Sequence, residues 1–221
     1  MENYFNNRMI IRRNLQIKLL LLAFVVCRFG VAQSVSTVER TERKRIAAAM
    51  EQSLKHELLD VYYPRNLDTV YGGFLSNFTY DFKPTGDQEK MIVTQSRHTW
   101  TNAKAALRYP DKLYYRTDAT AGYHFLRDVM WDKQYGGFYT LVTRKGEIPT
   151  GDPADKNAYG NAFGMYALSA YYELTHDDSA LALAKKTFYW LEAHSHDSVH
   201  KGYFQHMKRD GEPVSRTANT P

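Results

Sequence analysis

Cysteine is almost missing from this chain of 221 residues, which contains only Cys27. Because Cys27 lies in a segment that we expect to be cleaved off, the mature chain would have no cysteine, which excludes disulfides and thiol chemistry. The signatures of several enzyme classes are missing as well. The sequence has no phosphate-binding loop, no dinucleotide fingerprint and no Ser-His-Asp arrangement. These absences argue against nucleotide-dependent and serine-hydrolase chemistry.

An excess of charge is also missing once the N-terminus is set aside. The formal net charge is +5, but residues 1–32 hold five basic side chains and one acidic side chain. The remainder has 24 basic (29 − 5) and 23 acidic (24 − 1) side chains. A nucleic-acid partner calls for a clustered basic surface, so we expect none. Hydrophobic residues make up 43% of the chain and aromatic residues 14%, which is enough to fill a sizeable core.

Residues 1–32 are typical of an export signal. Basic residues such as Arg12 and Lys18 precede an apolar run over 19–27, and small residues follow just before Gln33. An apolar run of nine is too short to span a bilayer, which takes about 20 residues. We therefore predict a cleaved signal peptide, an exported protein that is periplasmic or extracellular, and no membrane association after cleavage.

Lipid anchoring through Cys27 is the alternative for this segment. A lipoprotein signal normally has a small residue before the cysteine, whereas this chain has the bulky Val26 there. We favour cleavage, which leaves residues 33–221 as one domain.

One turn motif occurs three times at a nearly constant spacing. Each copy starts with an aspartate and continues into glycine and an aromatic residue, and the intervals between the aspartates are 64 (132 − 68) and 65 (197 − 132). A fixed period indicates one repeated supersecondary unit, and this length accommodates two helices and their loops. We interpret the turns as structural, since their glycines permit positive φ. The copies are 68–74 (DTVYGGF), 132–138 (DKQYGGF) and the looser 197–204 (DSVHKGYF).

Hydrophobic periodicity predicts an all-α fold. Helices before each turn are amphipathic, as in an outer layer, and helices after it are rich in small and aromatic residues, as in an inner layer. We expect a short strand or loop over 74–82 and a short β-hairpin over 138–146. Alternating layers predict an incomplete (α/α)6 barrel, because a closed ring of such pairs needs on the order of 390 residues. The expected helices cover 36–61, 89–107, 111–130, 157–174 and 179–196.

The inner helices carry the residues best suited to bind a ligand. Gln95, Arg97 and Trp100 lie within two turns at the start of one inner helix, and Tyr159 lies near the start of the next. Arginine offers a rigid fork of donors, and tryptophan offers a face for stacking. Because the interval from Arg97 to Tyr159 is 62 (159 − 97), we expect them at equivalent ends of neighbouring helices, facing one cavity. The structural alternatives are an arginine lying over a core Trp100 and a core Tyr159.

Three histidines and an aspartate form the pattern H-x-H-D-x-x-H, which is compatible with zinc binding. His194, His196, Asp197 and His200 span a helix end and a turn, away from the expected cavity. We favour an interpretation as cations at a helix C-terminus. We therefore predict no metal site and no cofactor.

Four segments of the sequence carry a resemblance to a known family: Gln95-x-Arg97-x-x-Trp100, the turn at 132–138, Lys156-x-x-Tyr159-x-x-Ala162-Phe163-x-x-Tyr166-Ala167-Leu168, and Phe188-x-x-Leu191-Glu192-x-His194-x-x-Asp197. Together they resemble the N-acylglucosamine 2-epimerase and cellobiose 2-epimerase family, over about residues 40–221. The resemblance implies an (α/α)6 barrel that inverts C2 of a reducing-end sugar through ring opening and an enediolate; some members isomerise aldoses to ketoses. It implies that Arg97 stabilises the enediolate oxygen, that Tyr159 hydrogen-bonds the substrate, and that Trp100 and Gln95 contribute to binding.

The family's acid–base histidines belong to later helices. None of the eight histidines here occupies either position, so we expect the N-terminal part of an epimerase-like protein that lacks its acid and base. The expected partner is a small-molecule sugar or disaccharide. Two alternatives stay open: a glycoside hydrolase or lyase on the same toroid, which needs paired carboxylates, and a sugar-binding protein without catalysis.

Overall fold

The computed structural model describes residues 37–149 and 156–214. The chain divides into two compact units, Met1–Leu58 and Leu59–Pro221. The predicted signal peptide over 1–32 lies outside the described residues. Within the described ranges, none of the helices combines the length and the apolar character needed to cross a bilayer.

The described part of the first unit is helical. A regular helix over 37–53 continues as a π-helical segment, η1 (Leu54–Leu59), in agreement with the predicted helix 36–61. Ion pairs three and four residues apart support such a helix; they join Arg45 to Glu42 and Arg43 to Glu39.

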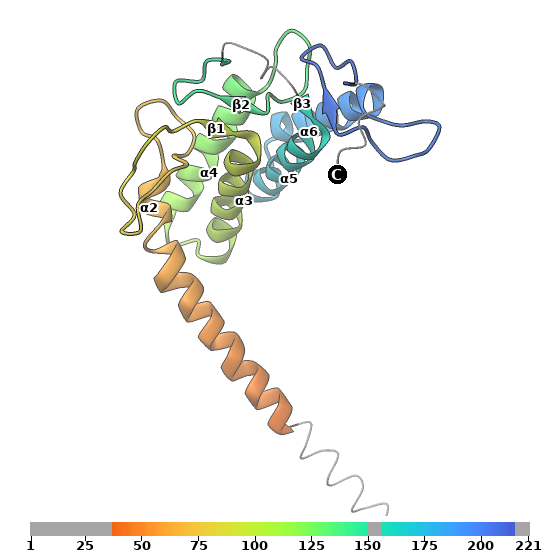
Figure 1. Ribbon diagram of the computed structural model, residues 1–221. Helices are drawn as coiled ribbons and strands as arrows, with labels where there is room; N and C mark the ends of the chain where they lie inside the picture. The colour runs from red at the N-terminus through yellow and green to blue at the C-terminus, as the bar shows by residue number, and fades with distance from the viewer. Residues whose placement is uncertain (1–36, 150–155, 215–221) are drawn as a thin grey trace, which may run out of the picture. The chain divides into compact units, whose positions relative to one another are not determined.

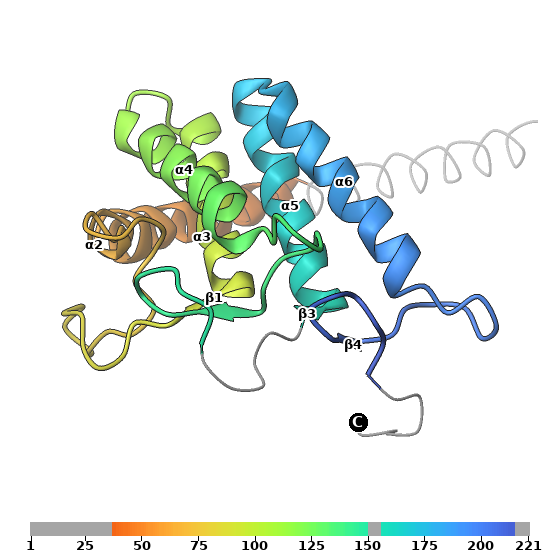
Figure 2. The same cartoon turned by 90° about the horizontal axis from the view of Figure 1, so that it is seen from above.

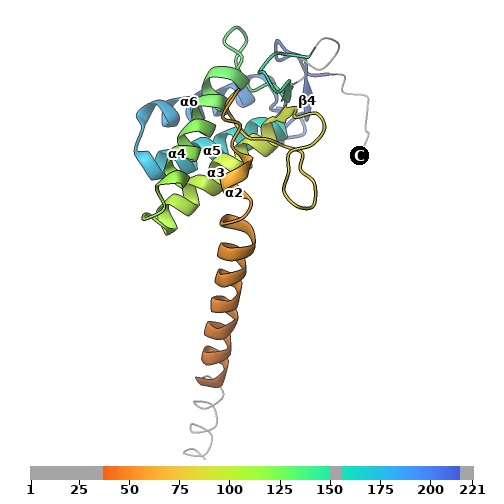
Figure 3. The same cartoon turned by 90° about the vertical axis from the view of Figure 1, so that its left-hand side faces the viewer.

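The second unit is built from two layers of helices (Figure 1). Packing contacts join α3 (Ile92–Arg108) to α4 (Leu113–Phe125) and to α5 (Ala158–Thr175), and join α5 to α6 (Asp178–His194); Figures 2 and 3 show α3 beside α5. The helices α3 and α5 form the inner layer, and α4 and α6 form the outer layer, as the alternating composition predicts. The unit also contains the short helical segments α2 (Tyr63–Asn66) and η2 (Leu126–Met130).

Capping and small residues explain the bounds and packing of α5. Asn157 caps its start by accepting a hydrogen bond from the Gly160 N–H, and His176 ends it in the left-handed conformation, with φ 56°. Gly164 lets the Phe138 ring approach, because a Cβ on Gly164 would lie 2.4 Å from that ring. Such small residues allow α5 to be buried between its neighbours.

The short strands in the described ranges pair between segments far apart in the sequence. Strand β1 (Lys90–Met91) pairs antiparallel with β2 (Leu141–Val142), and β3 (Lys156–Asn157) pairs antiparallel with β4 (His206–Met207). The hairpin predicted over 138–146 is therefore wrong in its pairing, since the partner of β2 is β1, which lies before α3. Residues 143–147 do form a tight turn.

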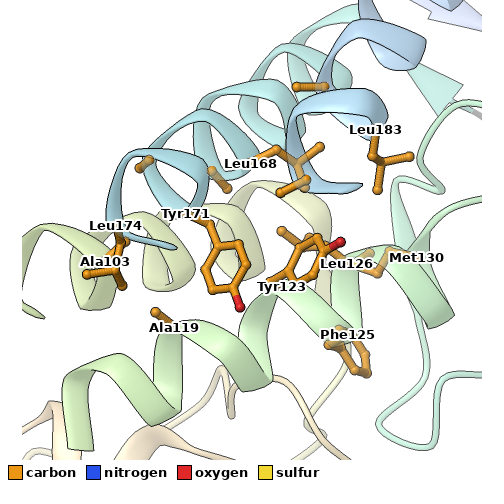
Figure 4. Packing of buried hydrophobic residues seen from close by; sticks show 14 of the residues in the cluster. Ala103, Ala119, Tyr123, Phe125, Leu126, Met130, Leu168, Tyr171, Leu174 and Leu183 are labelled. Atoms are coloured by element: carbon orange, nitrogen blue, oxygen red, sulfur yellow. The ribbon is translucent and has the colours of Figure 1, made fainter. Parts of the chain in front are cut away.

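The hydrophobic core lies between the two layers (Figure 4). The rings of Tyr123 on α4 and Tyr171 on α5 are stacked, with centroids 4.4 Å apart, and the Tyr123 hydroxyl lies 2.6 Å from Ser179 Oγ. Leu126 and Leu168 are fully buried beside them. This packing holds the outer helix α4 against the inner helix α5.

Asp68 forms the centre of the first repeated turn. Its Oδ1 accepts hydrogen bonds from the backbone N–H groups of Val70 and Tyr71, at 3.1 and 3.3 Å. Its Oδ2 accepts hydrogen bonds from Lys90 Nζ and Arg144 Nε, both at 3.0 Å. The buried Lys90 ammonium also donates to two backbone carbonyls, so this interior charge is paired and hydrogen-bonded.

The same arrangement recurs one repeat later around Asp132. Lys156 Nζ donates to Asp132 Oδ2 at 2.9 Å, and Arg209 Nε donates to the same oxygen at 3.0 Å. The interval between the two lysines is 66 (156 − 90), and that between the two arginines is 65 (209 − 144). We call each set an Asp-Lys-Arg node. The nodes show that the repeat includes long-range ion pairs as well as the turn itself.

Both node aspartates have strongly perturbed acidity. Burial by itself raises the pKa of Asp68 and of Asp132, but hydrogen bonds from Arg144 and Lys90, or from Arg209 and Lys156, outweigh it and hold each pKa well below the usual range. Both carboxylates are therefore ionised at neutral pH.

The third turn differs from the first two. Asp197 accepts hydrogen bonds from the backbone of Val199 and His200, and its Oδ2 lies 3.2 Å from the His200 ring. Among the described residues, no lysine or arginine side chain bonds to Asp197. An aromatic ring covers the glycines of the earlier turns, whereas a Cβ added at Gly202 would meet nothing within 4 Å.

Candidate functional site

A groove of about 570 Å³ lies between α3 and α5, the two inner helices. It contains three of the four residues that the sequence predicted for the site: Arg97 and Trp100 from α3, and Tyr159 from α5. The remaining lining residues are Thr101, Ala162, Phe163 and Tyr166. Helical spacing explains this grouping, because positions three or four apart share one face.

Arg97 is the one charged side chain among the described residues that line the groove. It is exposed, and its guanidinium carbon lies 6.0 Å from the centroid of the Phe163 ring, within cation–π range. In the described part of the chain, no carboxylate forms an ion pair with it. The guanidinium donors therefore remain available for a ligand.

Aromatic rings make up the rest of the surface. Trp100 is stacked on Tyr166, with centroids 5.0 Å apart and an interplanar angle of 15°. Tyr159 is 55% exposed and meets Phe163 edge to face at 4.8 Å. A polar donor beside several ring faces is the usual composition of a small-molecule site, and ring faces suit the apolar side of a sugar.

Gln95, the fourth predicted residue, does not line the groove. Its side chain is 1% exposed, its Oε1 accepts from the Phe74 N–H at 2.7 Å, and its Nε2 donates to the Phe74 carbonyl at 2.7 Å. Asn161 makes the corresponding bond to the Phe138 N–H at 2.8 Å in the next repeat. Because both amides hold the turn against the inner helix, the geometry gives Gln95 a structural role.

The structure also corrects the predicted equivalence of Arg97 and Tyr159. Gln95 and Asn161 have the same role, and the interval between them is 66 (161 − 95). The same interval leads from Arg97 to Phe163, so Phe163 is the equivalent residue. Tyr159 lies one helical turn earlier. It still reaches the groove, because residues four apart lie on the same side of a helix.

Phe163 and Tyr166 are groove residues to which the sequence interpretation gave no role. The signal that identifies them is the interval of 66, which leads from Arg97 to Phe163 (163 − 97) and from Trp100 to Tyr166 (166 − 100). The intervals between the turn aspartates are 64 and 65, so they do not lead from Arg97 to Phe163.

No histidine lines the groove. His98, next to Arg97 in sequence, packs against Tyr62, Tyr63 and Phe74 instead. Burial, together with the nearby Arg97 charge, lowers the pKa of His98 to about 4, so its ring is neutral at neutral pH.

The histidines near the third turn have separate contacts. His194 packs on Trp190 at 4.9 Å, His196 on Tyr203 at 5.6 Å, and His200 bonds to Asp197. Within 37–149 and 156–214, no group of three or more His, Cys, Asp or Glu residues is placed to hold a metal ion.

Similarity to known proteins extends over most of the chain. The family model of N-acylglucosamine 2-epimerase (GlcNAc 2-epimerase) matches residues 72–220. Cellobiose 2-epimerase from Bacteroides fragilis is 28% identical over 168 residues, covering 75% of this chain and 41% of that protein. Cellobiose 2-epimerase from Ruminococcus albus is 31% identical over 176 residues, covering 76% and 43%. The chain thus spans about two-fifths of the length of these relatives.

Solved structures show the same similarity. Cellobiose 2-epimerase from Spirochaeta thermophila has a TM-score of 0.71 at 31% identity, covering 77% of this chain and 41% of that one. A D-mannose isomerase has a TM-score of 0.63 at 25% identity, covering 71% and 38%.

A family 76 glycoside hydrolase from Bacteroides thetaiotaomicron has a TM-score of 0.57 at 17% identity, covering 76% and 34%; at that identity it shows the fold alone. These likenesses confirm the predicted (α/α)6 arrangement of helix pairs. With the family model matching more than half of its residues, the chain belongs to the N-acylglucosamine 2-epimerase family.

Proposed function

We propose that the groove between α3 and α5 binds a small sugar or a disaccharide by its reducing end and serves carbohydrate 2-epimerisation. The observation that carries this proposal is the meeting of Arg97, Trp100 and Tyr159 in one groove. The named activities of the similar proteins, cellobiose 2-epimerase and D-mannose isomerase, support the choice of a sugar as ligand.

The reaction gives Arg97 a clear role. In the open-chain sugar, a base removes the proton on C2, and the electron pair moves onto the carbonyl oxygen of C1 to give an enediolate. Return of a proton to the opposite face of C2 completes the inversion. A guanidinium close to the developing oxyanion lowers the energy of this intermediate, and Arg97 has no competing carboxylate partner within the described residues.

Tyr159 and Trp100 have binding roles in the proposal. The exposed Tyr159 side chain offers a hydroxyl that can donate to or accept from the sugar, and Trp100 offers a ring face. We leave Gln95 out of the sugar contacts, because its amide is bonded to Phe74 on both sides.

Proton transfer is not assigned to any groove residue. Among residues 37–149 and 156–214, no histidine, aspartate, glutamate or lysine lines the groove, although such side chains are the usual general bases. This observation favours a second candidate function for the described region, which is sugar binding without turnover. It disfavours a glycoside hydrolase in this groove, because that chemistry needs two carboxyl groups.

Incubation with cellobiose, mannobiose and N-acetylglucosamine in deuterated water tests the proposal. We expect saturable binding, weakened about tenfold or more in Arg97→Gln, because a charged hydrogen bond contributes about 1.5–3 kcal/mol. Arg65→Gln, a change at an exposed arginine on α2, is the matched control.

The C2 position of the recovered sugar separates the two candidates. Deuterium at C2 that disappears in Arg97→Gln supports epimerisation by the chain. Binding without deuterium at C2 supports the binding function alone. If none of the three sugars binds, both candidates fail.

We also propose that the protein is exported, on the basis of the basic and apolar N-terminal segment. Fusing residues 1–33 to a reporter enzyme that is active only outside the cytoplasm tests this. An inactive reporter, with an active one behind a known signal as control, would contradict export.

A further inference from the structure

Two pairs of groove residues come from equivalent positions of successive repeats. The interval from Arg97 to Phe163 is 66 (163 − 97), and that from Trp100 to Tyr166 is the same (166 − 100). The lysines of the two Asp-Lys-Arg nodes have this spacing too. Each of these two groove residues of α3 therefore faces its own counterpart on α5.

In both facing pairs, the side chain on α3 lies against an aromatic ring of α5. The Arg97 guanidinium carbon lies 6.0 Å from the Phe163 centroid, and the Trp100 and Tyr166 rings are stacked 5.0 Å apart at 15°. Arginine carries many rotamers that lose their freedom when it binds a ligand, so a ring that confines the guanidinium prepares it for binding.

The rings on α5 also support one another. Phe163 meets Tyr166 edge to face at 5.9 Å and meets Tyr159 at 4.8 Å. The row Tyr159–Phe163–Tyr166 is therefore continuous along one face of α5, as residues three and four apart should be. Such a row makes a continuous aromatic surface opposite the Arg97 and Trp100 side chains.

We propose that Phe163 and Tyr166 are positioning residues, which hold Arg97 and Trp100 in the orientation that receives the sugar. This inference rests on the proposed function, because it needs the groove to be the sugar site. It goes beyond that function because α5 then does more than supply Tyr159. The same helix also aligns the site residues of α3.

Tryptophan fluorescence offers a direct readout for the Tyr166 pair. The chain has three tryptophans, and Trp131 and Trp190 are 4% and 7% exposed, whereas Trp100 is half-buried at the groove. Quenching by acrylamide therefore reports mainly on Trp100. We expect cellobiose to protect Trp100 from quenching in the unmodified protein.

Tyr166→Leu removes the stack, and Tyr166→Phe keeps it. Because an aromatic pair contributes modestly beyond its buried area, we expect Tyr166→Leu to weaken cellobiose binding about two- to tenfold and to increase quenching without sugar. Tyr166→Phe should match the unmodified protein. Tyr189→Leu, at an exposed position on α6, is the control for general loss of an aromatic ring.

The outcomes separate this inference from the proposed function. If the unmodified protein shows no sugar protection of Trp100, the proposed function fails first. The positioning role of Tyr166 is overturned if cellobiose protects Trp100 and Tyr166→Leu matches the unmodified protein in two properties. These are its affinity for cellobiose and the quenching of its tryptophan fluorescence by acrylamide. If circular dichroism shows that Tyr166→Leu does not fold, the Phe163 variants decide the inference.

Phe163 is tested through the Arg97 side chain itself. The ring current of Phe163 should shift the Arg97 Nε–H resonance, and Phe163→Leu should remove that shift and weaken binding about two- to tenfold. Phe163→Tyr should retain both properties. An Arg97 resonance and an affinity unchanged in Phe163→Leu would overturn the positioning role of Phe163.

Discussion

At the scale of single residues, the unusual feature of this protein is that charged side chains lie in its interior. Asp68, Lys90, Asp132 and Lys156 have side chains that are at most 1% exposed, although charged groups seldom lie so deep. Each belongs to a node in which the charge is paired and the remaining donors bind backbone carbonyls. Such an arrangement tolerates burial but reacts strongly to the loss of one member.

Lys156→Met tests the second node. The substitution leaves the partly exposed Arg209 as the one cationic partner of Asp132 among the described residues, so we expect a loss of about 3–5 kcal/mol in the free energy of unfolding. Lys208→Met, which removes an exposed ion pair with Glu212, should change stability very little. Urea denaturation measures both, and an equally small loss in both variants would contradict the structural importance of the node.

Asp118 is a buried carboxyl of a different kind. It is 6% exposed, and within the described residues it has no hydrogen bond or ion pair. Burial raises its pKa to about 6, above the value of about 3.9 expected in the unfolded chain. A raised pKa in the folded state means that stability from this group is present below about pH 4 and is lost as the pH rises through about 6.

Asp118→Asn should therefore stabilise the protein at pH 7 and leave it unchanged at pH 4. The gain is at most about 3 kcal/mol, from a pKa difference of about two units. Unfolding by urea between pH 4 and 8 measures it, with Asp111→Asn, at an exposed carboxyl, as the control. A gain that is the same at every pH would contradict the ionisation argument.

At the scale of elements, the three copies of the repeated turn differ in whether an aromatic ring covers their glycines. The glycines of the turn at 132–138 have positive φ and lie against the Trp190 ring, whose Nε1 donates to the Tyr135 carbonyl at 2.9 Å. Phe125 lies in the same way against Gly73 in the first turn. The turn at 197–204 has the same backbone bonds but an open glycine.

Gly137→Ala and Gly202→Ala form a matched pair for this difference. Both glycines have positive φ, 71° and 82°, so both alanines are strained. Only Gly137 also lies against a ring: a Cβ there would be 2.8 Å from Trp190. We expect Gly137→Ala to cost about 1–3 kcal/mol more than Gly202→Ala. Equal losses in chemical denaturation would show that the covering ring is unimportant.

At the scale of the whole molecule, stability should decrease from the inner helix pair towards the third turn. The helices α3 and α5 pack on each other and on the outer layer, and the first two turns are held by nodes. The turn at 197–204 has neither a node nor a covering ring among the described residues. Local opening follows such differences in burial and bonding.

Amide hydrogen exchange measures this gradient. Amides in the middle of α3 and α5 should exchange slowest, and those in the turn at 197–204 should exchange faster than those at 68–74 and 132–138. The two earlier turns serve as internal controls of the same local sequence pattern. Equal protection of all three turns would contradict the view that node and ring stabilise them.

Much of the architecture could be predicted because it depends on local patterns. The spacing of turns and the alternation of amphipathic and small-residue helices predicted the helix pairs, and inner-helix position led to Arg97, Trp100 and Tyr159. The pairing of β1 with β2 and the role of Gln95 could not be predicted, because both depend on partners far away in the sequence.

The sequence by itself determined the repeat, the two layers and the family resemblance, since these follow from periodicity and short motifs. Only the tertiary structure decided that Lys90 and Arg144 meet at Asp68, that Gln95 holds Phe74, and that Phe163 and Tyr166 face Arg97 and Trp100. The physical reason is that backbone periodicity fixes the direction of a side chain, whereas the packing of helices chooses the group that it meets.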